Sequence, residues 1–351
     1  MTFNQLERAK SSRLKILGAV LTVCGLTLFA YFVYEAGFGE IWNGISRLGW
    51  GFFLLLGLYG VKLATRVAAW MMCVEPPHQL TFVEGFKAVV IGEALTVIIP
   101  LGILISGTAK AVAVRKQMPL VVGLSSIAVE NLFYTLATSI LVLGGAVSFL
   151  LLFDLSESVA TVNYILIALV LALIVGGILM IVYEWRFASV VAEWLYGRGL
   201  ATKVLDGGRT EVRRFEDLIY GFYRRNSRKF LPIMFFETVF HACGILEVWF
   251  ILQAIADVAP TFLTAFLLET INRVILVVFK LVPFLLGVDE AGARFITEAL
   301  AIGASVGVTL AIIRKGRVLV WTALGMLLVA RSGLSWKEIT SAVRDTQEAK
   351  A

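Results

Sequence analysis

The sequence predicts an all-α polytopic membrane protein with about six to eight transmembrane helices, including two re-entrant, broken helical hairpins in inverted repeats. Of its 351 residues, 59% are hydrophobic and only 16% are charged, whereas soluble domains carry about 25% charged residues. Several apolar runs reach or approach the roughly 20 residues that cross a bilayer as a helix. These runs are Leu14–Val33, Trp50–Val74, Leu120–Phe153, Tyr164–Val182 and Phe230–Ala256.

The first apolar run follows basic residues, as a secretory signal would. It is too long for a signal core, and no small-x-small cleavage site follows it, so we predict an uncleaved first span. The resulting organisation is a cytoplasmic N-terminus (1–13), a single membrane domain (14–335) and a cytoplasmic tail (336–351).

Basic residues beside the spans predict the orientation, because short cytoplasmic loops carry an excess of Lys and Arg. Segments 109–117 and 184–229 are basic and should be cytoplasmic, whereas 35–49 and the region of Asp154 should lie outside. The sequence therefore predicts a multi-pass protein of the inner (cytoplasmic) membrane with its N-terminus in the cytoplasm. Segment 184–229 also has an amphipathic helical pattern, suited either to anionic lipid surfaces or to a simple positive-inside anchor.

The apolar segment 82–105 does not fit a single crossing, because that would place the basic segment 109–117 outside. A hairpin that enters and leaves on the same side resolves the conflict, with Gly92, Pro100 and Gly102 as the helix break. The backbone groups freed by a break cannot face lipid, where each unpaired group is costly. Such an element must be buried in protein or line a wet cavity.

A related pattern occurs about half a chain later, in "LVPFLLGVDEAGARF", with Pro283 and Gly287 as the break. The matched pairs, 183 to 185 residues apart, are Pro100 and Pro283, Gly102 and Gly287, Lys110 and Arg294, and Glu130 and Arg314. Two similar halves (14–153 and 163–335) of opposite orientation are typical of transporters with alternating access. An alternative divides 296–331 into two crossings and gives about eight spans.

Ionisable residues within the apolar segments are the candidate site, because each costs roughly 2.5–3.5 kcal/mol on insertion scales. The residues expected to contact an anionic headgroup are Arg273, Lys280, Arg314 and Lys110. The expected counter-charges or proton-coupling sites are Glu93, Glu130, Glu269, Asp289 and Glu290. The alternative for each is an internal ion pair that fixes helix packing, and Lys62 and Arg66 are expected to snorkel to the cytoplasmic face.

The sequence contains no motif for zinc-dependent proteolysis or for nucleotide hydrolysis. Glu237 and His241 form E-x-x-x-H rather than the zinc-protease HExxH, so we predict a hydrogen-bonded structural pair, no metal and no cofactor. No phosphate-binding GxxxxGK[ST] loop occurs. The three cysteines have no metal-type spacing and are expected to be packing residues, and the basic residues flank spans, so no nucleic acid partner is expected.

Four stretches resemble the lysylphosphatidylglycerol synthase transmembrane region family, the flippase-like domain of the multiple peptide resistance factor. They are the break before Lys110, "SSIAVENLFYTLATSILVLGG" (125–145), "P…GVDEAGA" (283–293) and "IIRKGRVLVWTALGMLL" (312–328). The resemblance covers roughly residues 14–330. It implies a polytopic bacterial or archaeal inner-membrane protein associated with lipid translocation between leaflets.

This sequence departs from the family pattern at two places: no acidic residue lies between the first break and Lys110, and Asn131 stands where an arginine usually follows the glutamate. The fused aminoacyl-transferase domain is absent, so no lysyl transfer and no enzymatic activity are expected.

The predicted function is translocation or binding of an anionic lipid: a phospholipid, an aminoacyl-phospholipid or an isoprenoid-linked lipid. The alternatives are a non-catalytic subunit of a lipid or glycan biosynthesis complex and an intramembrane lipid-modifying enzyme. Membrane lipids are the expected ligands, and a second copy of the chain or a lipid-biosynthesis protein is the expected protein partner.

Overall fold

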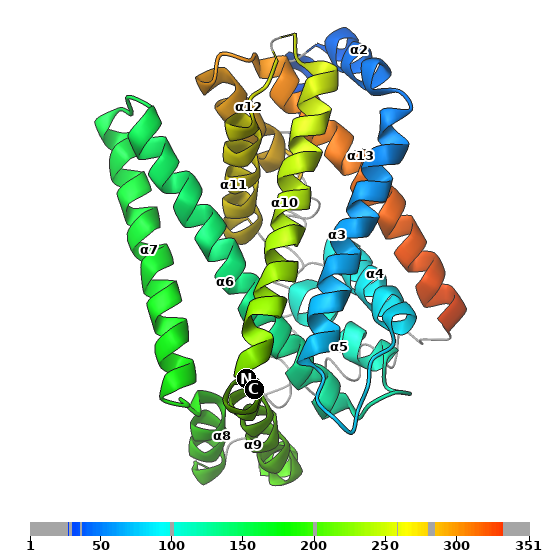
Figure 1. Cartoon of the computed structure of the whole chain (residues 1–351), viewed down its shortest axis with the longest axis vertical. Helices are drawn as coiled ribbons and strands as arrows, with labels where there is room; N and C mark the ends of the chain where they lie inside the picture. Colours follow the sequence, from blue (N-terminus) through cyan, green and yellow to red (C-terminus); the bar gives the residue numbers. More distant parts are fainter. Residues whose placement is uncertain are drawn as a thin grey trace, which may run out of the picture. The chain divides into compact units, whose positions relative to one another are not determined.

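The computed structural model describes residues 27, 30–35, 37–98, 102–198, 202–257, 259–279 and 285–332. Within these ranges the regular structure is helical and no strand occurs, which confirms an all-α protein (Figure 1). The helices are α2 (Phe38–Leu48), α3 (Gly51–Cys73), α4 (Phe82–Ile98), α5 (Gly102–Ala113), α6 (Leu120–Leu152), α7 (Glu157–Val182), α8 (Phe187–Gly197), α9 (Thr202–Arg225), η1 (Ser227–Lys229), α10 (Phe230–Ile255), α11 (Phe262–Val278), α12 (Val288–Ala299) and α13 (Ala304–Ser332).

Four helical segments of the described chain are long and apolar enough to cross a membrane: α3, α6, α7 and α10 with its preceding 3-10 turn. Their bounds agree with four of the predicted runs to within a few residues, except that α7 begins earlier, at Glu157. Helix α7 has no buried residue, so its apolar side chains are available to lipid. Together these features make the protein a multi-pass membrane protein. The predicted first run lies mostly outside the described residues.

Helix α13 is one continuous element of 29 residues, about 44 Å long at 1.5 Å per residue. The alternative that divided 296–331 into two crossings is therefore wrong. Three cations, Arg314, Lys315 and Arg317, interrupt the hydropathy of this segment without interrupting the helix, because straight-chain cations are good helix formers. The turn before α13 contains Ala301 and Gly303, both with positive φ.

Two series of four helices follow the same order along the chain. The first series is α3, α4, α5 and α6, with 23, 17, 12 and 33 residues. The second is α10, α11, α12 and α13, with 26, 17, 12 and 29 residues. Each series thus places a short helix pair between two long helices, at the positions where the sequence predicts hairpins.

The chain forms two compact units. Unit 1 comprises residues 1–59, 96–102 and 244–320, and unit 2 comprises residues 60–95, 103–243 and 321–351. The predicted halves, 14–153 and 163–335, do not coincide with these units, because helices α3, α10 and α13 each contribute residues to both.

In unit 2, α4 and α5 pack closely against each other on either side of the break. A Cβ at Gly92 would lie 2.8 Å from Lys110 Cγ and 2.9 Å from Ser106 Oγ, so only glycine allows this approach. Helix α4 continues through Gly92 to Ile98, so the prediction that Gly92 breaks the helix is wrong. Helix α5 begins at Gly102, and Pro100 lies outside the described residues.

In unit 1, α11 and α12 form the corresponding pair. Gly287, with φ of 78°, immediately precedes α12, as the predicted break requires, whereas Pro283 lies outside the described residues. Gly292 of α12 packs directly on Ile275 of α11. Helices α5 and α12 each have 12 residues and are about 18 Å long, too short for a hydrocarbon core of about 30 Å. Their re-entrant placement stays a prediction.

The core of unit 2 contains Ala69, Cys73, Val129, Phe133, Phe222 and Ile233, from α3, α6, α9 and α10. The predicted amphipathic segment 184–229 forms two packed helices, α8 and α9, rather than one. Glu216 of α9 accepts the backbone N–H groups of Ala188 (2.8 Å) and Ser189 (3.2 Å), and thereby caps the N-terminus of α8.

Replacing Gly307 by alanine tests the packing of α13 on α12. A Cβ at Gly307 would lie 2.6 Å from the carbonyl oxygen of Ala293, a backbone atom that cannot rotate away. We expect Gly307→Ala to lower stability by about 1–3 kcal/mol, measured as a lower unfolding temperature in detergent. Gly176→Ala is the matched control, since a Cβ there meets nothing within 4 Å. Equal unfolding temperatures for the two variants would contradict the described contact.

Glu75, in the loop after α3, tests the attachment of α9. Burial alone would raise the pKa of Glu75. The hydrogen bonds that Glu75 accepts from Arg225 (2.6 Å) and Asn226 (2.5 Å) lower this pKa and together outweigh burial, so the net shift is downward. The ionised Glu75 therefore stabilises the folded protein at pH values above the ordinary carboxyl pKa. This stabilisation is lost as the pH falls through the lowered pKa of Glu75. We expect Glu75→Gln to cost about 1 kcal/mol at neutral pH and nothing at strongly acidic pH, as measured by thermal unfolding. The exposed Glu84→Gln should show no such pH-dependent difference.

Candidate functional site

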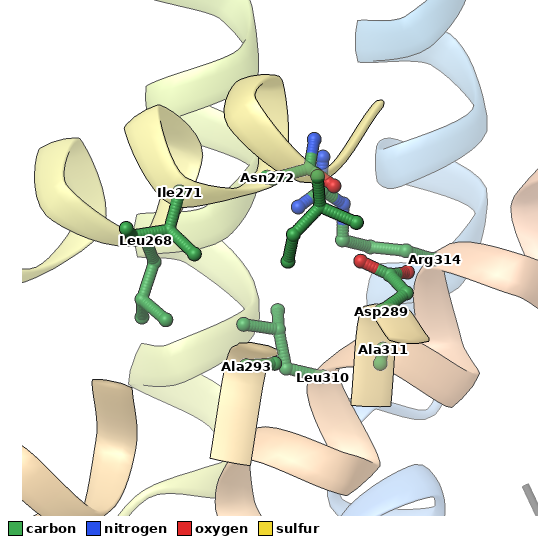
Figure 2. A pocket seen from close by; sticks show the side chains of 9 residues that line it. Leu268, Ile271, Asn272, Asp289, Ala293, Leu310, Ala311 and Arg314 are labelled. Carbon is green, nitrogen blue, oxygen red and sulfur yellow. The ribbon is translucent and has the colours of Figure 1, made fainter. Parts of the chain in front are cut away.

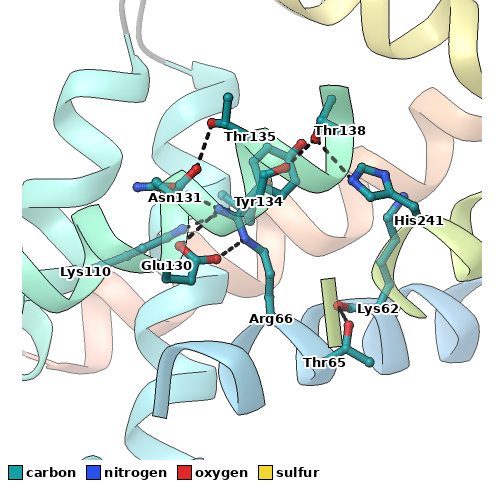
Figure 3. A network of polar contacts seen from close by, with 11 residues as sticks. Lys62, Thr65, Arg66, Lys110, Glu130, Asn131, Tyr134, Thr135, Thr138 and His241 are labelled. Atoms are coloured by element: carbon teal, nitrogen blue, oxygen red, sulfur yellow. Dashed lines mark hydrogen bonds and ion pairs between the residues drawn. The ribbon is translucent and has the colours of Figure 1, made fainter. Parts of the chain in front are cut away.

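Arg66 of α3 is the centre of a buried ion network in unit 2 (Figure 3). Its Nε donates to Glu130 Oε1 at 2.7 Å, its Nη2 to Asn131 Oδ1 at 3.0 Å and its Nη1 to Glu93 Oε1 at 3.3 Å. The guanidinium carbon lies 4.4 Å from the centroid of the Tyr134 ring, within range of a cation–π interaction. One cation is thus held by two carboxylates, an amide and an aromatic face.

Each helix of the first series contributes one charged group to this network: Arg66 from α3, Glu93 from α4, Lys110 from α5 and Glu130 from α6. Lys110 Nζ lies 3.9 Å from Glu93 Oε1. Because the four groups come from four helices, their pairing fixes the hairpin to the long helices on either side of it.

Lys62 and Arg66 do not snorkel to the surface, so that prediction is wrong. Lys62 is 3% exposed and Arg66 is 9% exposed. Lys62 Nζ lies 4.7 Å from the centroid of the Phe240 ring. Both side chains are held inside the protein, Lys62 by the Phe240 ring and Arg66 by Glu130, and do not extend to the lipid headgroups.

In unit 1, Glu269 of α11 bridges two arginines. Its Oε1 accepts from Arg273 Nε at 2.9 Å, and its Oε2 accepts from Arg314 Nη2 at 3.0 Å. Glu269 is completely buried, and both arginines are nearly so. The two guanidinium groups that share this carboxylate present hydrogen-bond donors in an arrangement that also suits a phosphate group.

Helix α10 adds a second carboxylate to this network. Glu247 Oε1 lies 3.5 Å from Arg314 Nε, and Glu247 Oε2 accepts from Arg317 Nη1. The guanidinium carbon of Arg317 lies 4.0 Å from the centroid of the Tyr59 ring. Arg314 is therefore paired with acids from two different helices.

The adjacent carboxylates at the start of α12 have defined partners. Glu290 lies 2.6 Å from Lys315 Nζ and Asp289 lies 3.5 Å from the same nitrogen. Glu290 also accepts the backbone N–H of Gly287 at 2.8 Å. The N-terminus of α12 is thus capped by the protein's own carboxylate.

The described unit 1 network carries no formal net charge. Its acids are Glu247, Glu269, Asp289 and Glu290, and its bases are Arg273, Arg314, Lys315 and Arg317. Each acid has at least one basic partner within 4.0 Å. This balance is what burial demands, because an unpaired charge in an apolar interior is far more costly than a paired one.

A small cavity adjoins Arg314 in unit 1 (Figure 2). Asn272, Asp289 and Arg314 form its polar wall, and its apolar lining comes from Leu268, Ile271, Ile275, Ala293, Leu310 and Ala311. With its side-chain amide oriented so that the nitrogen faces Asp289, Asn272 donates to Asp289 (3.1 Å) and accepts from Arg314 Nη2 (2.9 Å). The cavity holds about one water molecule, so it does not accommodate a lipid headgroup in this conformation.

The chain matches the family model described as "Lysylphosphatidylglycerol synthase TM region" over residues 15–343. The protein belongs to this family. The match covers nearly the whole chain and confirms the resemblance that the sequence motifs indicated. The family is one of membrane domains related to lipid handling. No curated protein and no solved structure matches the chain.

The structure brings together most of the predicted site residues, but in two separate networks. Arg273, Arg314, Glu269, Asp289 and Glu290 belong to the unit 1 network, and Lys110, Glu93 and Glu130 belong to the unit 2 network. Lys280 lies outside the described residues.

Arg294, matched to Lys110 by spacing, has a different environment. Its side chain is 22% exposed against 7% for Lys110, and it pairs with Glu35 and Glu298. This pair of matched positions is therefore not equivalent in the structure.

Six residues of the networks were not among the predicted headgroup contacts and counter-charges: Arg66, Asn131, Glu247, Asn272, Lys315 and Arg317. Three cations within four residues of an apolar helix, Arg314 to Arg317, were the sequence signal for the bases. Neutral amides give no such signal. Asn131, one of the two departures from the family pattern, accepts a hydrogen bond from Arg66.

Glu237 and His241 are not a hydrogen-bonded pair, contrary to prediction. His241 Nε2 lies 3.1 Å from Thr138 Oγ1, and its ring stacks on Tyr134. Neither carboxylate oxygen of Glu237 has a hydrogen-bond partner in the described structure. Among the described residues, no cluster of His, Cys, Asp and Glu has the geometry of a metal site.

Removing Arg66 tests whether pairing holds unit 2 together. Arg66→Met leaves Glu130 and Glu93 without their cation, and we expect a loss of about 3–5 kcal/mol, the usual cost of breaking a buried pair. The double variant Arg66→Met/Glu130→Gln removes one stranded charge and should recover part of that loss. Thermal unfolding in detergent measures both. A double variant as unstable as the single one would show that the pair is not the source of the stability.

Proposed function

We propose that this protein translocates an anionic lipid between the leaflets of the inner membrane. The phosphate of the headgroup would pass through the polar networks while the acyl chains remain in the bilayer. The candidate lipids are phospholipids, aminoacyl-phospholipids and isoprenoid-linked lipids. No covalent bond is made or broken in this movement.

The observation that carries the proposal is Glu269 between Arg273 and Arg314. Arginine forks bind carboxylate and phosphate in the same bidentate way. A lipid phosphate that replaced the Glu269 carboxylate would therefore find two cations already positioned by α11 and α13. Asn272, which contacts Arg314 from the cavity, would supply a neutral amide beside them.

The repeated order of helices supports alternating access. Glu93 and Arg273 each lie 11 residues after the first residue of α4 and α11, Phe82 and Phe262. Glu130 and Arg314 each lie 10 residues after the first residue of α6 and α13, Leu120 and Ala304. Charged groups at equal positions of corresponding helices are expected of inverted repeats, which transporters use to move a site between two faces.

The small cavity sets a condition on the mechanism. Since it holds about one water molecule, a headgroup enters only when the surrounding ion pairs separate. The neutral network opposes that separation, because each unpaired buried charge is costly. An arriving anion offsets the cost by taking the place of a carboxylate, which would couple opening of the network to the presence of lipid.

A second function, a non-catalytic subunit of a lipid-building complex, is favoured by α7. This helix has no buried residue and hence a complete face for a partner helix. Such a subunit would need paired charges for its own stability but would not move lipid. Leaflet exchange by the purified protein alone separates the two functions.

Arg314→Lys tests the translocator function. The variant keeps the positive charge beside Glu269 and Glu247 but loses the fork that binds two phosphate oxygens. We expect exchange of a fluorescent anionic phospholipid in liposomes to fall by about tenfold, the effect of losing roughly 1.4 kcal/mol. The unfolding temperature should change little.

Arg47→Lys is the matched control, because Arg47 pairs with Asp257 on an exposed surface. Its exchange rate should equal that of the unaltered protein. If Arg314→Lys exchanges lipid at the same rate as Arg47→Lys, the arginine fork is not the headgroup site. If the unaltered protein does not exchange lipid, the subunit function takes precedence.

A further inference from the structure

Glu237 of α10 has no role in either ion network. The residue is completely buried, at 0% exposed, and both carboxylate oxygens lack a hydrogen-bond partner among the described residues. Every other acid of the two networks has a basic partner within 4.0 Å. Glu237 is therefore an exception that requires a physical explanation.

Its neighbours on α10 show where the side chain lies. Ile233, one turn before Glu237, packs with Ala69 and Phe133 in the core of unit 2. His241, one turn after it, lies against Thr138 and Tyr134 of α6 (Figure 3). Because residues four apart share one helix face, Glu237 faces α3 and α6.

The charged and titratable groups of unit 2 near this face of α10 come from three other helices. They are Lys62, Arg66 and Cys73 of α3, Lys110 of α5 and Glu130 of α6. His241 is the other titratable group on the same face of α10. Arg66 is already bound by Glu130 and Glu93, and Lys110 lies beside Glu93.

Arg66 and Lys110 are thus bound to other acids, and Lys62 is positioned over the Phe240 ring, so an ionised Glu237 would be a buried charge without a basic partner in this arrangement. Such a charge costs many kcal/mol in an apolar interior, and a buried acid in this position binds a proton instead. The neutral carboxylic acid is thus the form that this arrangement accommodates.

We propose that Glu237 is a proton-binding site whose occupancy controls the pairing of Arg66 and Lys110. With the proton bound, Arg66 stays with Glu130 and Glu93. When the O–H bond breaks and the proton leaves to solvent, the carboxylate takes Arg66 or Lys110 as its counter-ion. One proton is exchanged, and no other bond is made or broken.

The consequence for transport rests on the proposed function. Arg66 and Lys110 join α3 and α5 to the rest of the network, so a change of their partner loosens the α4–α5 hairpin. Proton release would thereby favour an opened arrangement, and a proton gradient would drive lipid movement. Glu93 and Glu130, predicted from the sequence as counter-charges or proton-coupling sites, act in this proposal as the counter-ions of Arg66 and Lys110 while Glu237 is protonated.

Infrared difference spectroscopy of the protein in lipid nanodiscs tests the proton site directly. We expect a carboxylic acid C=O band that persists at neutral pH, shifts in D₂O and disappears at alkaline pH. Glu237→Gln, which keeps the shape of the protonated acid, should lack this band and remain folded. The exposed Glu193→Gln is the control and should retain it. A band that is unchanged in Glu237→Gln would overturn the proposal.

Lipid exchange in liposomes with and without an imposed pH gradient tests the coupling. We expect the gradient to accelerate exchange by the unaltered protein at least several-fold and to have no effect on Glu237→Gln. An equal response of both proteins would overturn the coupling while leaving the translocator function intact. A Glu237-dependent infrared band in a protein that exchanges no lipid would leave the proton site standing and reject the translocator function.

Discussion

A buried arginine needs a counter-ion, and Arg66 and Arg314 each bind one from another helix. Arg66 binds Glu130, which is 64 residues away in the sequence, and Arg314 binds Glu269, 45 residues away. Each pair therefore determines which helices are neighbours, in addition to compensating a charge. Apolar side chains cannot provide this selectivity within a membrane, because they pack about as well against lipid as against one another.

At corresponding positions, the two helix series carry buried charges of opposite sign. Long helix α6 carries the acid Glu130 where α13 carries the base Arg314, and the short helix α4 carries Glu93 where α11 carries Arg273. The charges of their partners are reversed as well: Glu130 pairs with a base on α3, and Arg314 pairs with an acid on α10. Both series therefore share the order of their helices and a balance of acids and bases in their ion networks. They differ in the sign of the charge at a given position.

The sequence predicted what depends on local composition and failed where distant partners decide. Four spans and both helix pairs followed from hydropathy, charge asymmetry and glycine or proline, all of which act within one segment. Glu269 and Arg273, which are four residues apart on α11, bind each other. Glu237 and His241 bind elsewhere or not at all, because spacing places two groups on one face without revealing what lies opposite. Gly92 was misread for the same reason: whether glycine breaks a helix or admits a neighbour depends on Lys110 of the next helix.

The neutrality of the unit 1 network also limits how an anion can bind. Four acids already match four bases, so an added phosphate leaves one acid in excess. That acid must reach water, take up a proton or remain as a costly buried charge. Asp289 is the best placed to reach water, since it lines the cavity, whereas Glu247, Glu269 and Glu290 are completely buried. Under the proposed function, Asp289 is therefore the acid expected to leave the network when an anion binds beside Arg314.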